Sequence, residues 1–166
     1  YQRRKFAGPW GLEGLVNLYK GIPQRRLRRV AREYCREKLM KGVKEALTEL
    51  KRKGYIVGAL STNPQFIMDV LSEILPLDFS EGTKLEFSEG IATGKILSRV
   101  DRYVKAQILK EKIHQFNLQK DEVTVVGESV TDLPLAEEAG LFIAFNANFR
   151  YWATVNLTFG LTTSKR

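Results

Sequence analysis

Three short apolar runs constrain the fold of this 166-residue chain more than any other feature of its sequence. They span residues 55–60, 123–126 and 141–145, and none shows the strict alternation of apolar and polar residues that marks a half-buried strand. Short runs of this kind are typical of strands buried on both faces of a parallel sheet. Helical patterns separate the runs and supply right-handed crossovers between parallel strands. The sequence therefore predicts an α/β fold with an open, Rossmann-like parallel sheet.

The remaining elements follow from local patterns. Apolar spacing predicts helices at residues 12–19, 24–37, 41–53, 66–75, 104–116 and 133–139. Gly54 is expected to end the third helix as its C′ residue. We expect a short parallel strand at residues 77–79 and a β-hairpin formed by residues 84–87 and 91–97. Residues 149–166 show no such pattern and are expected to form a C-terminal tail.

Composition narrows the class of protein. Hydrophobic residues make up 43% of the chain and charged residues 28%, which is ordinary for a globular domain. No apolar run approaches the roughly 18 residues that a membrane span needs, and no signal peptide opens the sequence. Cys35 is the single cysteine, which excludes an internal disulfide. We expect a cytoplasmic protein without a membrane segment, and because residue 1 is tyrosine we expect that an N-terminal portion precedes it.

A basic run contributes much of the net charge of +8. Its seven cationic residues are Arg25, Arg26, Arg28, Arg29, Arg32, Arg36 and Lys38. One interpretation is a surface for an anionic partner, either a phosphorylated substrate or a polyanion. The other is a solvated helix face, with a buried stripe formed by Leu27, Val30, Ala31 and Tyr34.

Polar residues follow two of the predicted strands, where ligands bind in open parallel sheets. The first strand is followed by Ser61-Thr62-Asn63. A later strand is followed by Gly127-Glu128-Ser129, with Asp132 four residues beyond Glu128. A hydroxyl before a helix N-terminus can hold a phosphoryl group, and two carboxylates on one loop suit Mg²⁺. Each group taken alone is also compatible with turn formation or helix capping.

These residues resemble three motifs of the haloacid dehalogenase superfamily, and more narrowly of its phosphoserine phosphatase branch. The fourth-motif pattern G-D-x-x-x-D, followed by A-G-L-x-x-A-F-x-A, resembles residues 127–132 and 139–147. The second motif resembles the stretch from Gly54 to Ser61. The third-motif pattern K-G-x-I-L is similar to Lys105-Ala106-Gln107-Ile108-Leu109. The resemblance covers roughly residues 12–147.

The resemblance implies a Mg²⁺-dependent phosphomonoester hydrolase that acts on a small phosphorylated metabolite. It implies catalytic roles for Lys105 and Ser61, substrate contacts from Ser61, Thr62, Asn63 and Lys105, and a metal site at Glu128 and Asp132. It also implies a small helical cap at residues 1–40 and a core at residues 41–148. The family forms an aspartyl-phosphate on a D-x-D-x-T strand.

The sequence departs from the family pattern in three places. It contains no D-x-D-x-T motif, Glu128 stands where the family has Asp, and Thr62-Asn63 stand where the branch has Gly-Gly. We expect the nucleophile strand to lie upstream of Tyr1 or to come from another chain, since two apolar strands would otherwise border a gap. The alternative function is a non-catalytic domain that binds nucleic acid or another polyanion through its basic helix.

Overall fold

The computed structural model describes residues 9–145, and the chain divides into two compact units, Tyr1–Val100 and Asp101–Arg166. The first unit contains four helices and three strands within its described residues: α1 (Pro9–Leu18), α2 (Gln24–Lys38), α3 (Val43–Arg52), β1 (Gly58–Pro64), α4 (Gln65–Ile74), β2 (Phe79–Ser88) and β3 (Ile91–Ser98). The described part of the second unit contains α5 (Arg102–Gln115), β4 (Thr124–Gly127), α6 (Leu133–Ala136) and β5 (Leu141–Ala144), with short 3₁₀ turns at Lys120–Glu122 and Val130–Asp132. The predicted α/β class is confirmed.

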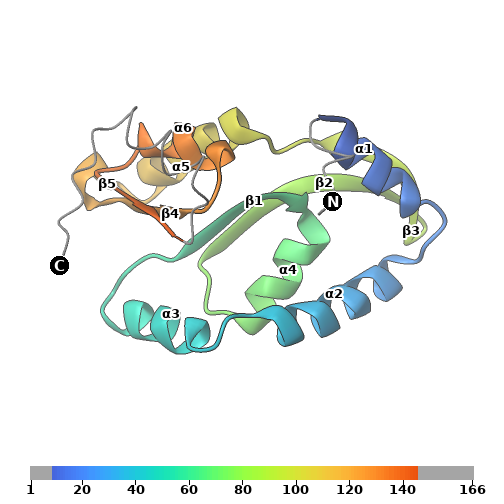
Figure 1. Ribbon diagram of the computed structural model, residues 1–166, viewed down its shortest axis with the longest axis horizontal. Helices are drawn as coiled ribbons and strands as arrows, with labels where there is room; N and C mark the ends of the chain where they lie inside the picture. Colours follow the sequence, from blue (N-terminus) through green and yellow to red (C-terminus); the bar gives the residue numbers. More distant parts are fainter. Residues whose placement is uncertain (1–8, 146–166) are drawn as a thin grey trace. The chain divides into compact units, whose positions relative to one another are not determined.

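The sheet of the first unit has the order β1-β2-β3. β1 runs parallel to β2, and β2 runs antiparallel to β3. Helix α4 packs against β1 and β2 on one side and against α2 on the other, while α1 packs against β3 (Figure 1). The predicted strands at 77–79 and 84–87 are therefore one strand, whose first half pairs with β1 and whose second half pairs with β3.

Two turns follow directly from their residues. Glu89 and Gly90 connect β2 to β3 with φ values of +50° and +77°, the left-handed pair that a two-residue type I′ hairpin turn requires. Gly54, with φ +86°, ends α3: its N–H donates to the Lys51 carbonyl, and the Tyr55 N–H donates to the Leu50 carbonyl. These two bonds are those of a Schellman motif. The predicted hairpin and the predicted stop at Gly54 are both confirmed.

The core of the first unit joins its N-terminal helices to its sheet. The buried cluster draws on α1, α2, α4, β2 and β3: Val16, Leu27, Ala31, Cys35, Phe66, Val70, Leu85 and Ala92. The expected stripe on α2 is wrong in part, because Val30 is 54% and Tyr34 62% exposed while Cys35 is buried. The true stripe follows i, i+4, i+8 spacing, which keeps it on one line of the helix facing α4. A cap at residues 1–40, separate from a core at 41–148, stays a prediction.

A carboxylate secures the start of β2. Asp78 accepts hydrogen bonds from the Lys51 ammonium on α3 and, at 2.7 Å, from the Val57 N–H just before β1. Burial alone raises the pKa of Asp78, but these two hydrogen bonds outweigh it and leave the pKa below its ordinary value. The carboxylate is therefore stabilised in its charged form.

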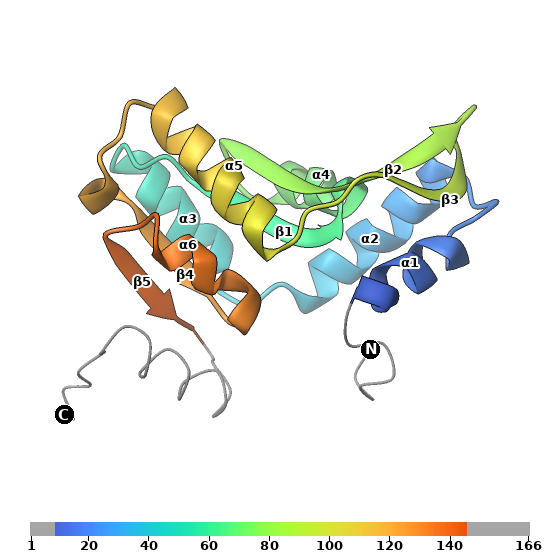
Figure 2. The same ribbon diagram turned by 90° about the horizontal axis from the view of Figure 1, so that it is seen from above.

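In the second unit, β4 and β5 form a parallel two-stranded sheet, and α5 packs against α6 (Figure 2). The expectation that the apolar runs are buried on both faces is wrong for the described residues. Tyr55 is 57%, Val126 61% and Leu141 51% exposed. Within residues 101–145 β4 and β5 pair only with each other, so each has an edge with no described strand beside it, and Tyr55 lies before β1, which begins at Gly58. The expected C-terminal tail at 149–166 lies outside the described residues.

Candidate active site

The predicted phosphate-binding residues lie on a bulge in β1. Leu60 pairs with Glu81 and Pro64 pairs with Thr83, so three residues of β1, Ser61 to Asn63, stand opposite the single residue Gly82 of β2. Such an insertion interrupts the ladder, leaves the extra residues without ladder partners and bends the strand. The bulge is closed by a local hydrogen bond in which the Asn63 N–H donates to Ser61 Oγ at 3.2 Å.

The bulge leads directly into a helix N-terminus. Pro64 is fully buried and precedes α4, whose first residue is Gln65 (Figure 1). Ser61 and Thr62 are half-buried, and Asn63 is exposed. The first N–H groups of a helix lack intrahelical acceptors and carry the positive end of the helix dipole. A hydroxyl, a bulged backbone and this helix start make a surface that suits a phosphoryl group.

The predicted catalytic lysine forms a buried ion pair in the second unit. Lys105 Nζ lies 2.6 Å from Asp132 Oδ1, and the two side chains are only 6% and 12% exposed. The lysine sits in the first turn of α5, where Asp101 caps the helix by accepting hydrogen bonds from the Tyr103 and Val104 N–H groups. The cap fixes the first turn and so fixes where the ammonium group can reach.

The other oxygen of Asp132 organises the loop after β4. Asp132 Oδ2 accepts hydrogen bonds from the Glu128 N–H and the Ser129 N–H, each at 3.2 Å, and from Ser129 Oγ at 3.3 Å. Glycine at position 127 lets the backbone lie close to Asp132 and Phe142, because a Cβ there would lie 2.7 Å from Asp132 Cβ and 2.9 Å from Phe142 Cζ. Asp132 thus connects the lysine of α5 to the backbone on which Glu128 is carried.

The two predicted metal ligands differ in what they offer a cation. Glu128 is exposed, and its carboxylate makes no hydrogen bond or ion pair with the residues that the structure describes. Asp132 is buried with both oxygens engaged. No cluster of three or more His, Cys, Asp or Glu side chains occurs within residues 9–145. These two residues alone would give Mg²⁺ a partial site, in which Glu128 would supply a carboxylate oxygen while Asp132 Oδ2 holds the Glu128 backbone N–H.

The structure brings Lys105, Glu128 and Asp132 together, and it places Ser61, Thr62 and Asn63 together on one bulge. The convergence of both groups on one phosphate stays a prediction. The sequence analysis did not identify Ser129 as a hydrogen-bond donor to the Asp132 carboxylate. The S-x-x-D spacing of a capping box was the signal that could have identified it.

Two arginines of the basic run on α2 form ion pairs with α4. Arg28 contacts Asp69 and Glu73 on α4, and Arg32 contacts Glu73. The hydrogen bond from Arg32 is the main reason that the pKa of Glu73 lies below its ordinary value. The remaining arginines of α2 are exposed: Arg25, Arg26, Arg29 and Arg36. Binding of nucleic acid or another polyanion stays a prediction, for which these four side chains and Lys38, whose ammonium pairs with Glu37, are exposed.

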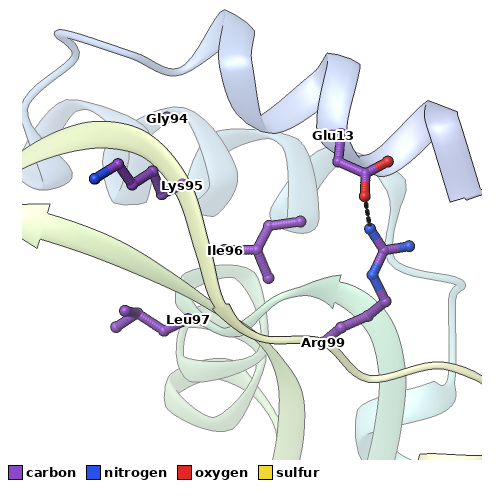
Figure 3. A pocket seen from close by; sticks show the side chains of 6 residues that line it. All are labelled: Glu13, Gly94, Lys95, Ile96, Leu97 and Arg99. Carbon is purple, nitrogen blue, oxygen red and sulfur yellow. Dashed lines mark hydrogen bonds and ion pairs between the residues drawn. The ribbon is translucent and has the colours of Figure 1, made fainter.

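An open pocket of about 560 Å³ lies between α1 and β3 (Figure 3). In Figure 3 the Glu13 carboxylate on α1 points at the Arg99 guanidinium, with which it forms an ion pair. The other residues of its lining are Gly94, Lys95, Ile96 and Leu97, so none of the predicted site residues lines it.

Among the described helices, none has both the length and the apolar character needed to cross a membrane.

Comparison with known proteins gives a consistent set of relatives. The phosphoserine phosphatase of Archaeoglobus fulgidus is 39% identical over 137 residues, which cover 82% of this chain and 39% of that protein. The phosphoserine phosphatase of Streptococcus thermophilus is 32% identical over 133 residues, covering 80% of this chain and 60% of that protein. Among solved structures, a probable phosphoserine phosphatase from Vibrio cholerae matches with a TM-score of 0.78 at 28% identity, covering 92% of this chain and 46% of that one.

The chain therefore spans between 39% and 60% of the length of these relatives. The sequence pattern of the haloacid dehalogenase-like hydrolases matches residues 11–137, which is most of the chain. The resemblance to the haloacid dehalogenase superfamily and its phosphoserine phosphatase branch is thereby confirmed, and the roles of the individual residues stay predictions. This chain belongs to the haloacid dehalogenase-like hydrolase family, within which it is similar to the phosphoserine phosphatases.

Proposed function

We propose that this chain forms the phosphate- and metal-handling part of a Mg²⁺-dependent phosphomonoester hydrolase. Its substrate is a small phosphorylated metabolite, and the reaction passes through an aspartyl-phosphate whose nucleophile lies outside residues 1–166. Support comes from the relatives, several of which are named phosphoserine phosphatases, and from the absence of a D-x-D-x-T motif in this sequence. A cytoplasmic location is part of the same proposal, in keeping with a single cysteine and no disulfide.

The observation that carries the proposal is the buried pair of Lys105 and Asp132. Removing two charges from water is costly, and a hydrophobic pair of similar size would often be as stable or more so. We infer that the charge of this pair is used in function. A cation at Lys105 would neutralise the negative charge that gathers where a phosphate, a carboxylate nucleophile and metal-binding acids meet.

The chain's own residues then have separate tasks. Ser61 would donate its hydroxyl hydrogen to a phosphoryl oxygen, and Thr62 and Asn63 would add contacts from the same bulge. Lys105 would hold negative charge at the reacting centre. Glu128 would hold Mg²⁺. Asp132 would fix the positions of the Lys105 ammonium and the Glu128 backbone through its two oxygens. Bound Mg²⁺ supplies positive charge that offsets the charge of the transferring phosphoryl group.

The identity of the metabolite is open within this class. Thr62-Asn63 stand after Ser61 where the phosphoserine branch has two glycines. Glycines let backbone N–H groups approach a ligand closely, and side chains at both positions narrow that approach. We therefore propose a small phosphomonoester as the substrate class, with phosphoserine as one compound to be compared with others.

The test is hydrolysis of 4-nitrophenyl phosphate and of phosphoserine by the complete protein, with Mg²⁺ and with EDTA. Activity is expected with Mg²⁺ and is expected to vanish with EDTA. Lys105→Met should lower kcat/KM by about a hundredfold or more, as expected for loss of preorganised charge. Lys110→Met is the matched control, since Lys110 lies on the same helix and is exposed.

A third variant separates the metal role from the lysine role. Glu128→Gln keeps the size of the side chain and removes its charge, so it should raise the Mg²⁺ concentration for half-maximal activity by about tenfold or more. Activity that persists in EDTA would overturn the metal assignment. A Lys105→Met enzyme within threefold of wild type would overturn the role of the buried pair.

A further inference from the structure

The bulge at Ser61–Asn63 is not self-supporting. Three residues of β1 stand opposite Gly82 alone, so the ordinary ladder bonds between β1 and β2 are interrupted there. Its internal hydrogen bond, from the Asn63 N–H to Ser61 Oγ, ties the bulge to itself and not to the sheet. Another group is needed to fix the position of the bulge, because backbone without ladder partners keeps more conformational freedom, which is costly to remove.

Thr83 makes that connection. Its side chain is fully buried, with 0% exposure. Its hydroxyl donates to the Thr62 carbonyl at 3.0 Å and accepts from the Val100 N–H at 3.1 Å. One hydroxyl thus satisfies a carbonyl of the bulge and an N–H of the segment that follows β3. Without it, the buried Val100 N–H and the half-buried Thr62 carbonyl would both lose this partner.

The neighbouring residues leave little room for any other arrangement. A Cβ at Gly82 would lie 2.6 Å from the Asn63 carbonyl oxygen and 2.8 Å from Met68 Cγ. The Gly82 N–H donates instead to Gln65 Oε1 at 2.6 Å, and Gln65 Nε2 donates to the Ser80 carbonyl at 3.2 Å. The side-chain amide at the start of α4 therefore takes over a bond that the bulge removed from the ladder.

We propose that Thr83 is a positioning residue that holds the Ser61–Asn63 bulge in its phosphate-binding conformation. It does so through the hydrogen bond from its hydroxyl to the Thr62 carbonyl and not through its bulk. The inference rests on the proposed function in one respect, since the bulge affects catalysis only if its residues hold the phosphate. Thr83 itself touches no substrate in this proposal.

The experiment compares three variants of the complete protein. Thr83→Val keeps the shape and removes the hydroxyl, and Thr83→Ser keeps the hydroxyl and removes a methyl group. Thr93→Val is the matched control, because Thr93 lies on β3 of the same sheet and donates to Glu86, away from the bulge. Amide hydrogen exchange of the peptide covering residues 58–66 reports the bulge directly. The inhibition constant of inorganic phosphate, with kcat and KM for 4-nitrophenyl phosphate, reports its function.

Thr83→Val is expected to speed exchange within residues 58–66 by about tenfold and to raise the phosphate inhibition constant by a similar factor, as the loss of a buried hydrogen bond implies. Thr83→Ser should restore both to within about threefold, and Thr93→Val should change neither by more than about twofold. If Thr83→Val does not fold, Gly82→Ala serves as the second variant, since its Cβ would press on the Asn63 carbonyl.

The outcomes separate the two proposals. Unchanged exchange in Thr83→Val, or a lowered melting temperature with unchanged exchange and unchanged phosphate inhibition, overturns the positioning role. If Thr83→Val speeds exchange but the wild-type protein shows no Mg²⁺-dependent turnover, the positioning of the bulge is supported and the proposed function is overturned. Failure of Thr83→Ser to rescue would assign the effect to packing and so overturn the role of the hydroxyl.

Discussion

Replacing Lys105 tests directly how much the buried ion pair stabilises the second unit. In Lys105→Met the long side chain keeps most of its volume, while Asp132 Oδ1 loses the ammonium group 2.6 Å away. Removing one partner of a buried pair costs about 3–5 kcal/mol, because the other charge is left uncompensated. Here the lower end applies, since Asp132 Oδ2 keeps its hydrogen bonds from Glu128 and Ser129 and its side chain is 12% exposed. We expect a loss of about 3 kcal/mol in the free energy of unfolding.

Urea-induced unfolding measures this loss. With a denaturant dependence of about 2 kcal/mol per molar, 3 kcal/mol lowers the urea midpoint by about 1.5 M. Lys110→Met on the exposed side of α5 should lie within about 0.5 kcal/mol of wild type. In the double variant Lys105→Met/Asp132→Asn, the two costs should fall short of additivity by about 2 kcal/mol, which is the coupling between the partners. Equal midpoints for Lys105→Met and Lys110→Met would falsify the account of the pair.

Three further predictions follow from other contacts. Gly127→Ala would place a Cβ 2.7 Å from Asp132 Cβ, so we expect about 1–3 kcal/mol of destabilisation and weaker Mg²⁺ binding, measured by urea unfolding and metal titration; a neutral effect on both would contradict the tight loop. Gly58→Ala would place a Cβ 2.0 Å from the Phe79 ring, so the urea midpoint should fall below that of wild type; an unchanged midpoint would refute the contact. The lowered pKa of Asp78 stabilises the fold above the unfolded-state pKa of about 3.9, and this contribution disappears as the pH falls through the folded-state pKa. Asp78→Asn should therefore be less stable than wild type at pH 7 and lose less stability than wild type on acidification, as acid titration followed by circular dichroism would show; parallel curves for the two proteins would count against it.

Much of the fold could be predicted because its signals are local. The helix that became α2 was predicted at residues 24–37 and ends at Lys38, and the stop after α3 came from a single glycine, Gly54. The hairpin was predicted from the turn residues Ser88-Glu89-Gly90, of which Glu89 and Gly90 adopt the left-handed region. Each of these signals depends on a few neighbouring residues, so no knowledge of the rest of the chain was needed.

The candidate site was predictable in its residues but not in its geometry. The carboxylates at positions 128 and 132 were expected to act alike, as two metal ligands. In the structure one is exposed and the other is buried with both oxygens engaged. That division depends on Lys105, 27 residues away along the chain, and on which oxygen faces the loop backbone. Sequence spacing carries no information about either.

The sequence by itself determined which segments are helices, where the hairpin turns and which side chains are chemically suited to a phosphate. Only the tertiary structure decided that β2 is one continuous strand, that the apolar faces around Tyr55 and Val126 are exposed, and that Ser61–Asn63 form a bulge fixed by Thr83. The physical reason is that strand register and burial depend on partners distant in sequence, whereas turns and helix ends depend on backbone preferences of adjacent residues.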